Sequence, residues 1–250
     1  MGTEKGFLWY PFSMSTLYLA ATPIGNLEDI TMRTLRCLKE ADVIACEDTR
    51  HTQGLLSHFD IKKRLIACHS HNEEQSSKGI LELLDQGQDI VYVSDAGTPG
   101  VSDPGSRLVE YVRANSSHDI VPLPGCSAGV TLVSVAGRIG KTFTFEGFLS
   151  PKKGRRTKRL TELIGRKEAF IIYESPFRVL KTLEEIKELD ESLIIVMGRE
   201  MTKQFEEIRK GTVGEIIALL KAKPSIKGEF ALLVAPGWDE DDKSEEDTDA

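Results

Sequence analysis

The sequence has little of what marks a disulfide-rich, zinc-binding or membrane-spanning protein. Its 250 residues include only four cysteines, without a Cys-x-x-Cys pair, so neither a disulfide framework nor a zinc ribbon is indicated. No apolar run approaches the roughly 20 residues of a membrane span, and residues 7–12 are too short an apolar stretch for a signal sequence. His69 and His71 stand in a polar loop where solvated or substrate-facing roles are expected. We therefore expect no metal, and reduced thiols in a cytoplasmic protein.

Acidic residues outnumber basic ones, 39 to 32, but the excess is unevenly distributed. The net charge of −7 equals that of residues 239–250 alone, which hold eight acidic residues and one lysine. A segment this acidic and polar cannot bury enough apolar surface to offset the entropy that it would lose on folding. Residues 238–250 are therefore expected to form a disordered acidic tail. Residues 1–16 are interpreted as a loose N-terminal extension, with Met14 as an alternative start.

The body of the chain concentrates its cations in one segment. Residues 152–159 carry six positive charges in eight positions, directly after Phe-Leu-Ser-Pro, so the segment is predicted to open as a loop. A dense positive loop in a body whose net charge is near zero can neutralise backbone phosphates of a nucleic acid. A merely solvated surface is the alternative. The residues expected to grip RNA are Lys152, Lys153, Arg155 and Arg156.

The order of predicted elements is typical of an α/β protein. From residue 17 to residue 123, short apolar runs alternate with segments of helical period, which predicts a mostly parallel sheet covered by helices. Two prolines and a glycine at 122–125 interrupt this pattern, and a second set of strands and helices follows. One of its helices is expected at 177–189, capped by Ser175 with Pro176 at the first position. We expect two α/β domains, 17–124 and 125–237.

A glycine-rich loop follows the most apolar predicted strand. Residues 95–105 read DAGTPGVSDPG, and glycines 97, 100 and 105 permit backbone angles and close approaches that a Cβ would prevent. Asp103 and Pro104 are expected to cap and begin the next helix. Ligands in open α/β sheets bind beyond the carboxyl ends of strands, so this loop is predicted to cradle a ligand. A tight connection without a ligand is the alternative.

Seven short motifs follow one another at characteristic spacing: ATPIGNL (21–27), EDTR (47–50), SDAGTPGVSDPG (94–105), PGCSA (124–128), YESP (173–176), REMTK (199–203) and GEF (228–230). In their order and spacing the chain resembles the bacterial small-subunit (16S) ribosomal RNA cytidine 2′-O-methyltransferases of the tetrapyrrole methylase-like superfamily. The likeness runs from about residue 17 to residue 236. One position departs from the pattern, because Phe177 precedes Arg178 where a histidine is expected.

The resemblance implies a class III methyltransferase, a homodimer with S-adenosylmethionine as methyl donor in the cleft between the two domains. It implies an rRNA or small-subunit particle as substrate and no metal. Carried over position by position, the donor-binding residues fall on Pro23, Gly25, Asp95, Ala96, Gly97, Val101, Ser127, Ala128, Glu174 and Phe230.

Methyl transfer to a ribose hydroxyl calls for a group that accepts the proton. Glu47 and Asp48 are the candidates, because they directly follow the second predicted strand, at the same sheet edge as the glycine-rich loop. Arg50 is expected to anchor phosphate or orient these carboxylates, although an ion pair that merely closes the loop is the alternative. Lys203 lies in a second polar group that can serve instead.

Two other functions are compatible with the sequence. One is methylation of a small tetrapyrrole-like molecule, against which stand the basic segment and the EDTR motif. The other is a module that senses a nucleotide-like ligand without catalysis. Methyl transfer to purified small ribosomal subunits would separate these three functions.

Overall fold

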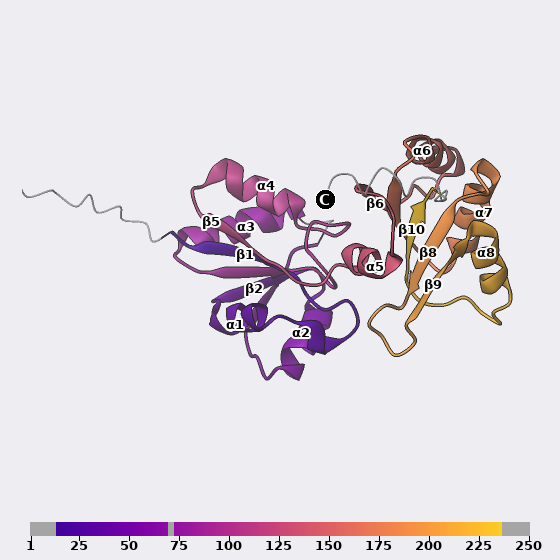
Figure 1. Ribbon diagram of the computed structural model, residues 1–250. Helices are drawn as coiled ribbons and strands as arrows, with labels where there is room; N and C mark the ends of the chain where they lie inside the picture. The colour runs from indigo at the N-terminus through magenta and orange to yellow at the C-terminus, as the bar shows by residue number, and fades with distance from the viewer. Residues whose placement is uncertain (1–13, 70–72, 237–250) are drawn as a thin grey trace, which may run out of the picture. The chain divides into compact units, whose positions relative to one another are not determined.

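The computed structural model describes residues 14–69 and 73–236, so the acidic tail, nearly all of the N-terminal extension and His71 lie outside the described residues. The chain divides into two compact units, Met1–Cys126 and Ser127–Ala250. Each unit contains one five-stranded sheet with helices packed against it (Figure 1). The expected fold class, two α/β domains, is confirmed.

The sheet of unit 1 is entirely parallel, in the strand order β3-β2-β4-β1-β5. Strand β4 is at its centre and is buried along its whole length, which is why this segment reads as a continuous apolar run. All five carboxyl ends lie at one edge of the sheet. The strands are β1 (Thr16–Ala20), β2 (Val43–Cys46), β3 (Arg64–Ala67), β4 (Ile90–Val93) and β5 (Asp119–Leu123).

Helices cover both faces of this sheet. Cys37, Leu38 and Leu56 of α1 and α2 pack in one apolar cluster, whereas Ile80 and Leu108 of α3 and α4 pack in the other. Figure 1 shows α1 and α2 on one side of the strands and α3 and α4 on the opposite side. The helical elements are η1 (Leu27–Asp29), α1 (Met32–Glu40), α2 (Thr49–His58), α3 (Glu73–Asp85) and α4 (Ser106–Asn115).

The sheet of unit 2 is mixed, in the order β6-β7-β10-β8-β9. Strands β6 and β7 are parallel, and the remaining neighbours are antiparallel. Because β8 is two antiparallel steps from β7, strands β6, β7 and β8 all end at the same edge. The strands are β6 (Phe143–Phe148), β7 (Ala169–Glu174), β8 (Ile194–Arg199), β9 (Glu207–Thr212) and β10 (Phe230–Ala235).

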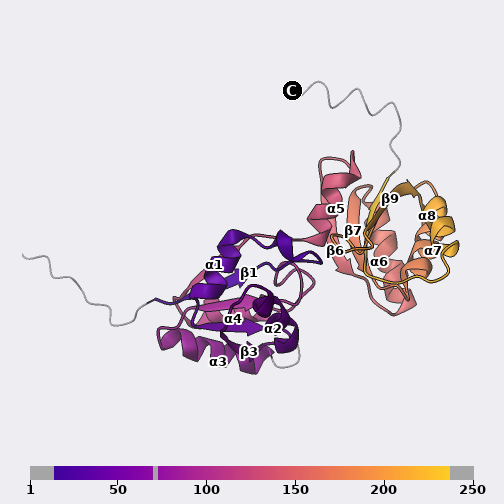
Figure 2. The same cartoon turned by 90° about the horizontal axis from the view of Figure 1, so that it is seen from below.

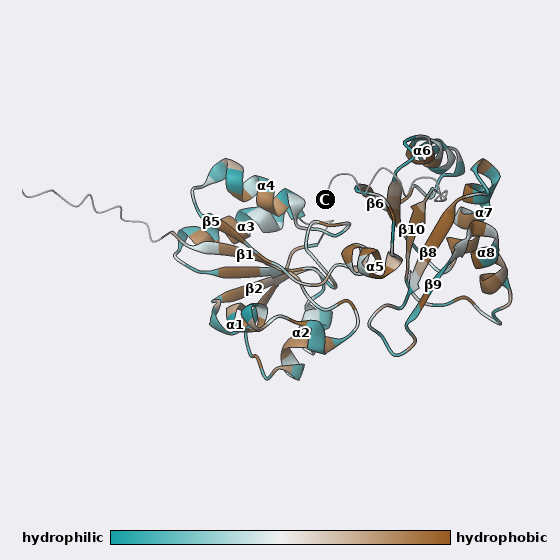
Figure 3. Ribbon diagram, in the orientation of Figure 1, coloured by the Kyte–Doolittle hydropathy of each residue, from teal (hydrophilic) through white to brown (hydrophobic). Residues whose placement is uncertain are grey.

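One helix covers one face of this second sheet and three helices cover the other. Leu132 of α5 packs on the first face, and Leu160, Leu183 and Leu220 of α6, α7 and α8 pack on the second. Figure 2 shows this separation, and Figure 3 shows the strands of both sheets as predominantly apolar. The helices are α5 (Ala128–Ala136), α6 (Lys153–Gly165), α7 (Val179–Leu189) and α8 (Val213–Lys221).

Three local predictions are wrong. The basic segment is not a loop, because α6 begins at Lys153. Helix α7 begins at Val179 instead of residue 177, and no side chain caps it. Helix α4 is not capped by Asp103, because Gly105 occupies the N-cap position and offers no side chain. In both capping errors a tight turn separates the proline from the first helical residue, so the proline lies in the turn.

Candidate functional site

The glycine-rich loop is tied to the loop after β1 by main-chain hydrogen bonds. The N–H of Thr22 donates to Gly97 O at 2.9 Å, and the N–H of Gly97 donates to Thr22 O at 3.0 Å. Gly97 has φ +78°, while a Cβ there would meet Ile24 Cγ2 at 3.5 Å and Cys126 O at 3.7 Å, both ordinary contact distances. The backbone conformation, rather than lack of space, therefore requires glycine at this position.

A buried carboxylate fixes the far end of the same loop. Glu73 Oε1 accepts hydrogen bonds from the N–H groups of Gly105 and Arg107, at 3.0 and 3.2 Å, at the start of α4. It takes the role that the sequence had assigned to Asp103. Gly105 has φ +124°, and a Cβ would lie 2.8 Å from Tyr92 Cε1. The loop between these two fixed ends carries Val101, which is exposed.

The loops after β1 and β5 complete this edge of unit 1. Thr98 Oγ1 donates to Cys126 O at 3.0 Å, and Cys126 Sγ contacts Asp29 O at 3.4 Å. A Cβ on Gly125 would lie 2.9 Å from Ala21 Cβ, so these two loops require glycine to approach so closely. Three loops that are far apart in sequence are thereby joined into one surface.

Asp48 lies at this edge but is fully engaged. Its N–H donates to Asp95 Oδ1 at 3.0 Å, and its own carboxylate caps α2 by accepting from Arg50 N at 2.8 Å. The Arg50 guanidinium also pairs with Asp48 at 2.8 Å. Hydrogen bonds from Arg50 hold the pKa of the Asp48 carboxyl well below its usual value. Asp48 therefore stays ionised and is a poor proton acceptor.

Glu47 has the opposite electrostatic character. Burial raises the pKa of its carboxyl, and the negative charge of Asp95 raises it further, against a hydrogen bond from the Asp95 main chain. None of the ion pairs among the described residues involves Glu47. A half-buried carboxyl with a raised pKa at a strand end is suited to accept a proton near neutral pH.

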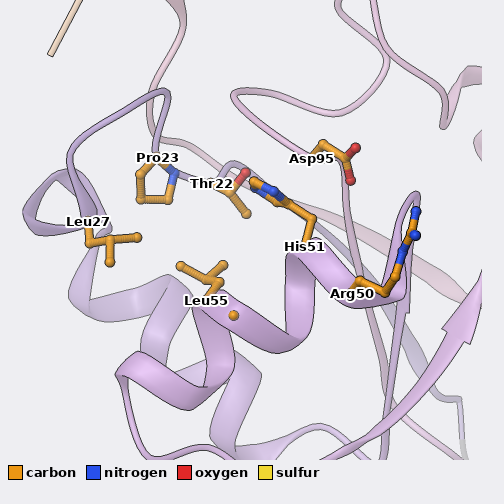
Figure 4. A pocket seen from close by; sticks show the side chains of 8 residues that line it. Thr22, Pro23, Leu27, Arg50, His51, Leu55 and Asp95 are labelled. Atoms are coloured by element: carbon orange, nitrogen blue, oxygen red, sulfur yellow. The ribbon is translucent and has the colours of Figure 1, made fainter. Parts of the chain in front are cut away.

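A cavity of about 370 Å³ opens at this edge. Figure 4 shows Pro23, Leu27 and Leu55 on one side of it, with Asp95 and Arg50 on the other. Its size is in the usual range for small-ligand sites. Sequence reasoning identified three of these residues but missed His51, which follows Arg50 on the first turn of α2. The lining residues are Thr22, Pro23, Leu27, Arg50, His51, Gly54, Leu55 and Asp95.

The residues of unit 2 that were predicted to contact the donor differ in their accessibility. Ser127 is the N-cap of α5 and Ala128 is its first residue, and both are partly exposed. The Glu174 carboxylate is buried and accepts hydrogen bonds from Arg178 Nε at 2.7 Å, Thr182 Oγ1 at 2.9 Å and Ser175 N at 2.8 Å. The side chain of Phe230 is also buried. The side chains of Glu174 and Phe230 are thus unavailable to a ligand, so a donor contact at either position would have to come from the main chain.

Lys203 belongs to an ion-pair cluster of unit 2. Its Nζ lies 3.0 Å from Glu200 Oε1 and 2.8 Å from Glu229 Oε2. Burial alone would lower the pKa of Lys203, but hydrogen bonds to Glu229 and Glu200 outweigh it and raise the pKa. Lys203 therefore stays protonated, so it does not fit the role of a base.

The predicted RNA-binding residues separate into two kinds. Lys152, Lys153 and Arg155 are exposed at the start of α6. Arg156 is buried, with its side chain 2% exposed, and forms a bidentate pair with Glu185 of α7. Arg156 therefore cannot grip RNA, and its prediction is wrong. The helical period turns this one cation of the segment inward.

No cluster of three or more His, Cys, Asp or Glu side chains among the described residues is placed to hold a metal ion. No described helix is long and apolar enough to cross a membrane.

Comparisons with known proteins agree on one family. The family model "Tetrapyrrole (Corrin/Porphyrin) Methylases" matches residues 16–217. The chain is 46% identical over 224 residues to the "Ribosomal RNA small subunit methyltransferase I" of Escherichia coli O157:H7, covering 89% of this chain and 78% of that protein. Proteins of the same name from Bacillus subtilis (strain 168) and Borrelia garinii are 41% and 44% identical, with coverage of 93% and 88% of this chain and 79% and 98% of theirs.

Solved structures share the fold at much lower identity. A diphthine synthase structure aligns with a TM-score of 0.67 at 15% identity, covering 88% of this chain and 90% of that one. A cobalt precorrin-4 methyltransferase aligns with a TM-score of 0.64 at 19% identity, covering 88% and 94%. At these identities the likeness concerns the fold alone.

Proposed function

Because the chain belongs to the tetrapyrrole methylase family, among relatives named ribosomal RNA small subunit methyltransferase I, we propose that it transfers a methyl group from S-adenosylmethionine to a cytidine 2′-oxygen of small-subunit rRNA. The observation that carries this proposal is the identity of 41–46% to those relatives over most of the chain. The edge of unit 1 supports it, because Glu47, Asp95 and the cavity lie together there.

The glycine-rich loop (residues 95–105), called the donor loop below, suits the methyl donor in its charge and in its exposed main chain. S-adenosylmethionine carries a positively charged sulfur, and the loop offers the Asp95 carboxylate beside Glu47. Ala96 is exposed, so a ligand can approach the main chain of this turn there, whereas Gly97 is buried with its main chain bonded to Thr22. Pro23, Gly25 and Val101 belong to the same surface. The contacts expected from Ser127 and Ala128 stay predictions.

Methyl transfer requires residues of the protein to position the ribose oxygen and to accept its proton. The donor, when bound, supplies a methyl carbon on a sulfonium. The ribose oxygen forms a bond to that carbon as the carbon–sulfur bond breaks, and the hydroxyl proton passes to the Glu47 carboxylate. Asp48 and Arg50 position the loop that carries Glu47, since their ion pair and cap fix the start of α2. Holding the oxygen at near-attack distance supplies most of the rate.

RNA binding is assigned to the exposed start of α6. Lys152, Lys153 and Arg155 are exposed, and none of the ion pairs among the described residues uses them. Each unneutralised cation can displace a counterion from a phosphate, which makes binding sensitive to salt. Replacing the three with alanine should weaken RNA binding and flatten its salt dependence. Unaltered affinity and salt slope would remove this assignment.

The decisive experiment is transfer of a labelled methyl group to purified small ribosomal subunits that lack the modification. Mass mapping of the rRNA should then find one new ribose methyl group on a cytidine. A methyl group on the base, or on another nucleotide, would overturn the 2′-oxygen assignment while leaving rRNA methylation intact. Transfer only to a tetrapyrrole would overturn the proposed substrate. The homodimer implied by the sequence resemblance is checked by light scattering, against a chain mass of 27.7 kDa.

A further inference from the structure

Unit 2 exposes phenylalanine side chains to an unusual degree. Phe177 is 94% exposed, Phe205 is 68% exposed and Phe148 is 61% exposed. Large apolar side chains this accessible, when grouped, mark a surface that binds a partner. Phe177 is not part of the apolar core, since it lies in the turn before α7, which begins at Val179.

All three rings belong to one edge of the second sheet. Phe148 is the last residue of β6, Phe177 follows the end of β7, and Phe205 follows the end of β8. These three strands run in the same direction, so their carboxyl ends lie together. Phe143, which is 41% exposed, begins β6 and therefore lies at the opposite edge.

The loop that carries Phe177 is held rigidly against the loop that leads to α6. Arg178 donates to Leu149 O at 3.1 Å while Glu174 holds its guanidinium at 2.7 Å. Arg156 donates to Pro151 O at 3.2 Å in the same loop. Phe148 packs edge-on against Tyr173, with ring centroids 5.7 Å apart. These contacts fix the turn that carries Phe177 and the ring of Phe148 without covering Phe177, so the ordering entropy that opposes binding is confined to the Phe177 side chain.

The charge next to these rings is positive and unpaired. Arg156, Arg159 and Arg178 are bound by glutamates. Lys152 and Lys153, by contrast, are exposed and take part in no ion pair among the residues that the structure describes. An exposed aromatic ring on a fixed turn beside free cations complements a nucleic-acid strand whose bases are unpaired, because the ring stacks on a base while the cations meet its phosphates.

We propose that Phe177, supported by Phe148, is a stacking platform for an unpaired base of the RNA substrate, beside the cations at the start of α6. The proposal rests on the proposed rRNA function for the identity of that strand. It predicts that the enzyme prefers single-stranded over duplex RNA at this surface. A duplex hides the faces of its bases, so it would meet only the cations.

The test compares Phe177→Ala, Phe177→Leu and Phe177→Trp in the full chain, using a fluorescent single-stranded RNA oligonucleotide and the same sequence as a duplex. Stacking losses of this kind correspond to roughly 5- to 100-fold in affinity. Alanine and leucine should both weaken single-strand binding about ten-fold, whereas tryptophan should retain it. Duplex binding and the salt slope should be unchanged in all three, because the ring carries no charge.

Phe143→Ala is the matched control, since it removes an exposed ring from the opposite edge and should leave RNA binding unaltered. Leucine that binds as well as the parent would overturn stacking and indicate an apolar contact with a protein instead. Alanine that binds as well would remove Phe177 from the interface altogether. Methyl transfer by the parent protein is measured in parallel, so failure of the rRNA function is seen separately from failure of the platform.

Discussion

The two units differ in how they pair the glutamates at their sheet edges, although Asp48 of unit 1 is held by Arg50 as the glutamates of unit 2 are held by arginines. In unit 2, the glutamates near the carboxyl ends of β6 and β7 are bound by arginines, as in the pairs Glu174 with Arg178 and Glu185 with Arg156. In unit 1, Glu47 follows β2 and takes part in none of the ion pairs of the described residues. The hydrogen bonds of Arg156 lower the pKa of Glu185, whereas burial and Asp95 raise the pKa of Glu47.

This difference separates two tasks. A glutamate held by a guanidinium is ionised and geometrically fixed, so it stabilises loops but cannot exchange a proton near neutral pH. A half-buried glutamate beside another carboxylate is poised to do so. In unit 2 the paired glutamates therefore hold loops in place, while phenylalanine rings and the cations at the start of α6 stay exposed. In unit 1 the Glu47 carboxylate is left without a cationic partner near the cavity.

The largest expected effect comes from removing that carboxylate. Glu47→Gln keeps the shape of the side chain but cannot accept the ribose proton, so single-turnover methyl transfer should fall by roughly 10²- to 10⁴-fold. The parent rate should rise with pH through the raised pKa of Glu47, and this rise should be absent from the variant. Donor binding, measured by calorimetry, should be nearly unchanged.

Glu40→Gln is the matched control, because Glu40 is exposed at the end of α1 and should be silent. A Glu47→Gln variant that transfers methyl groups at the parent rate would show that the raised pKa serves no proton transfer. The comparison between the units would then reduce to a difference in packing.

The next effect breaks the best-formed pair of unit 2. Arg156→Ala leaves the Glu185 carboxylate buried without its partner, so the free energy of unfolding in urea should fall by about 3–5 kcal/mol. The Arg156 and Glu185 side chains are only 2% and 6% exposed, so water cannot replace the lost contact. Arg155→Ala removes the neighbouring exposed cation and should change stability by less than about 0.5 kcal/mol.

Replacing both Arg156 and Glu185 with apolar residues tests whether the lost stability comes from the unpaired Glu185 carboxylate. Arg156→Met with Glu185→Leu should recover most of the lost stability, because a buried ion pair is often no better than well-packed apolar side chains of similar volume. A double variant as unstable as Arg156→Ala would mean that Arg156 stabilises mainly through its hydrogen bonds to the carbonyls of Ser150 and Pro151.

Sequence reasoning gave the parallel sheet of unit 1 because periodicity and apolar runs are local signals. It also placed Glu47 and Asp95 at one edge, since strands that run in parallel end together. It failed where the outcome depends on a partner distant in sequence. The sequence around Arg156 does not predict its pairing with Glu185, which is 29 positions away. Likewise, the sequence around Gly105 does not predict that Glu73 caps α4.

A smaller effect is expected from the turn of the donor loop. Gly97→Ala places a Cβ at φ +78°, which costs roughly 1–2 kcal/mol for an L-residue. Because that strain lies in the turn joined to Thr22, donor affinity should fall with stability. Gly79→Ala is the control, since it lies within α3 with open space around it and should stabilise by about 0.5–1 kcal/mol. Unaltered donor affinity in Gly97→Ala would separate this turn from donor binding.

The smallest effect is the pH dependence of stability, and its sign differs between the units. The folded protein binds the Glu47 proton more tightly than the unfolded chain, so this group's contribution falls as pH rises from about 4.3, the unfolded pKa, through the folded value. The contribution of Glu185 is present above the unfolded pKa and is lost as pH falls through its lowered folded value.

Relative to the parent, Glu47→Gln should therefore gain stability as the pH rises above about 4.3, whereas Glu185→Gln should lose stability as the pH rises toward about 4.3 from below. Urea unfolding of the three proteins on both sides of this pH measures both slopes. Parallel slopes would contradict the opposite electrostatics of the two edges. Opposite slopes together with a silent Glu47→Gln in methyl transfer would preserve the electrostatic contrast but detach it from catalysis, because the raised pKa would then reflect only burial and the proximity of Asp95.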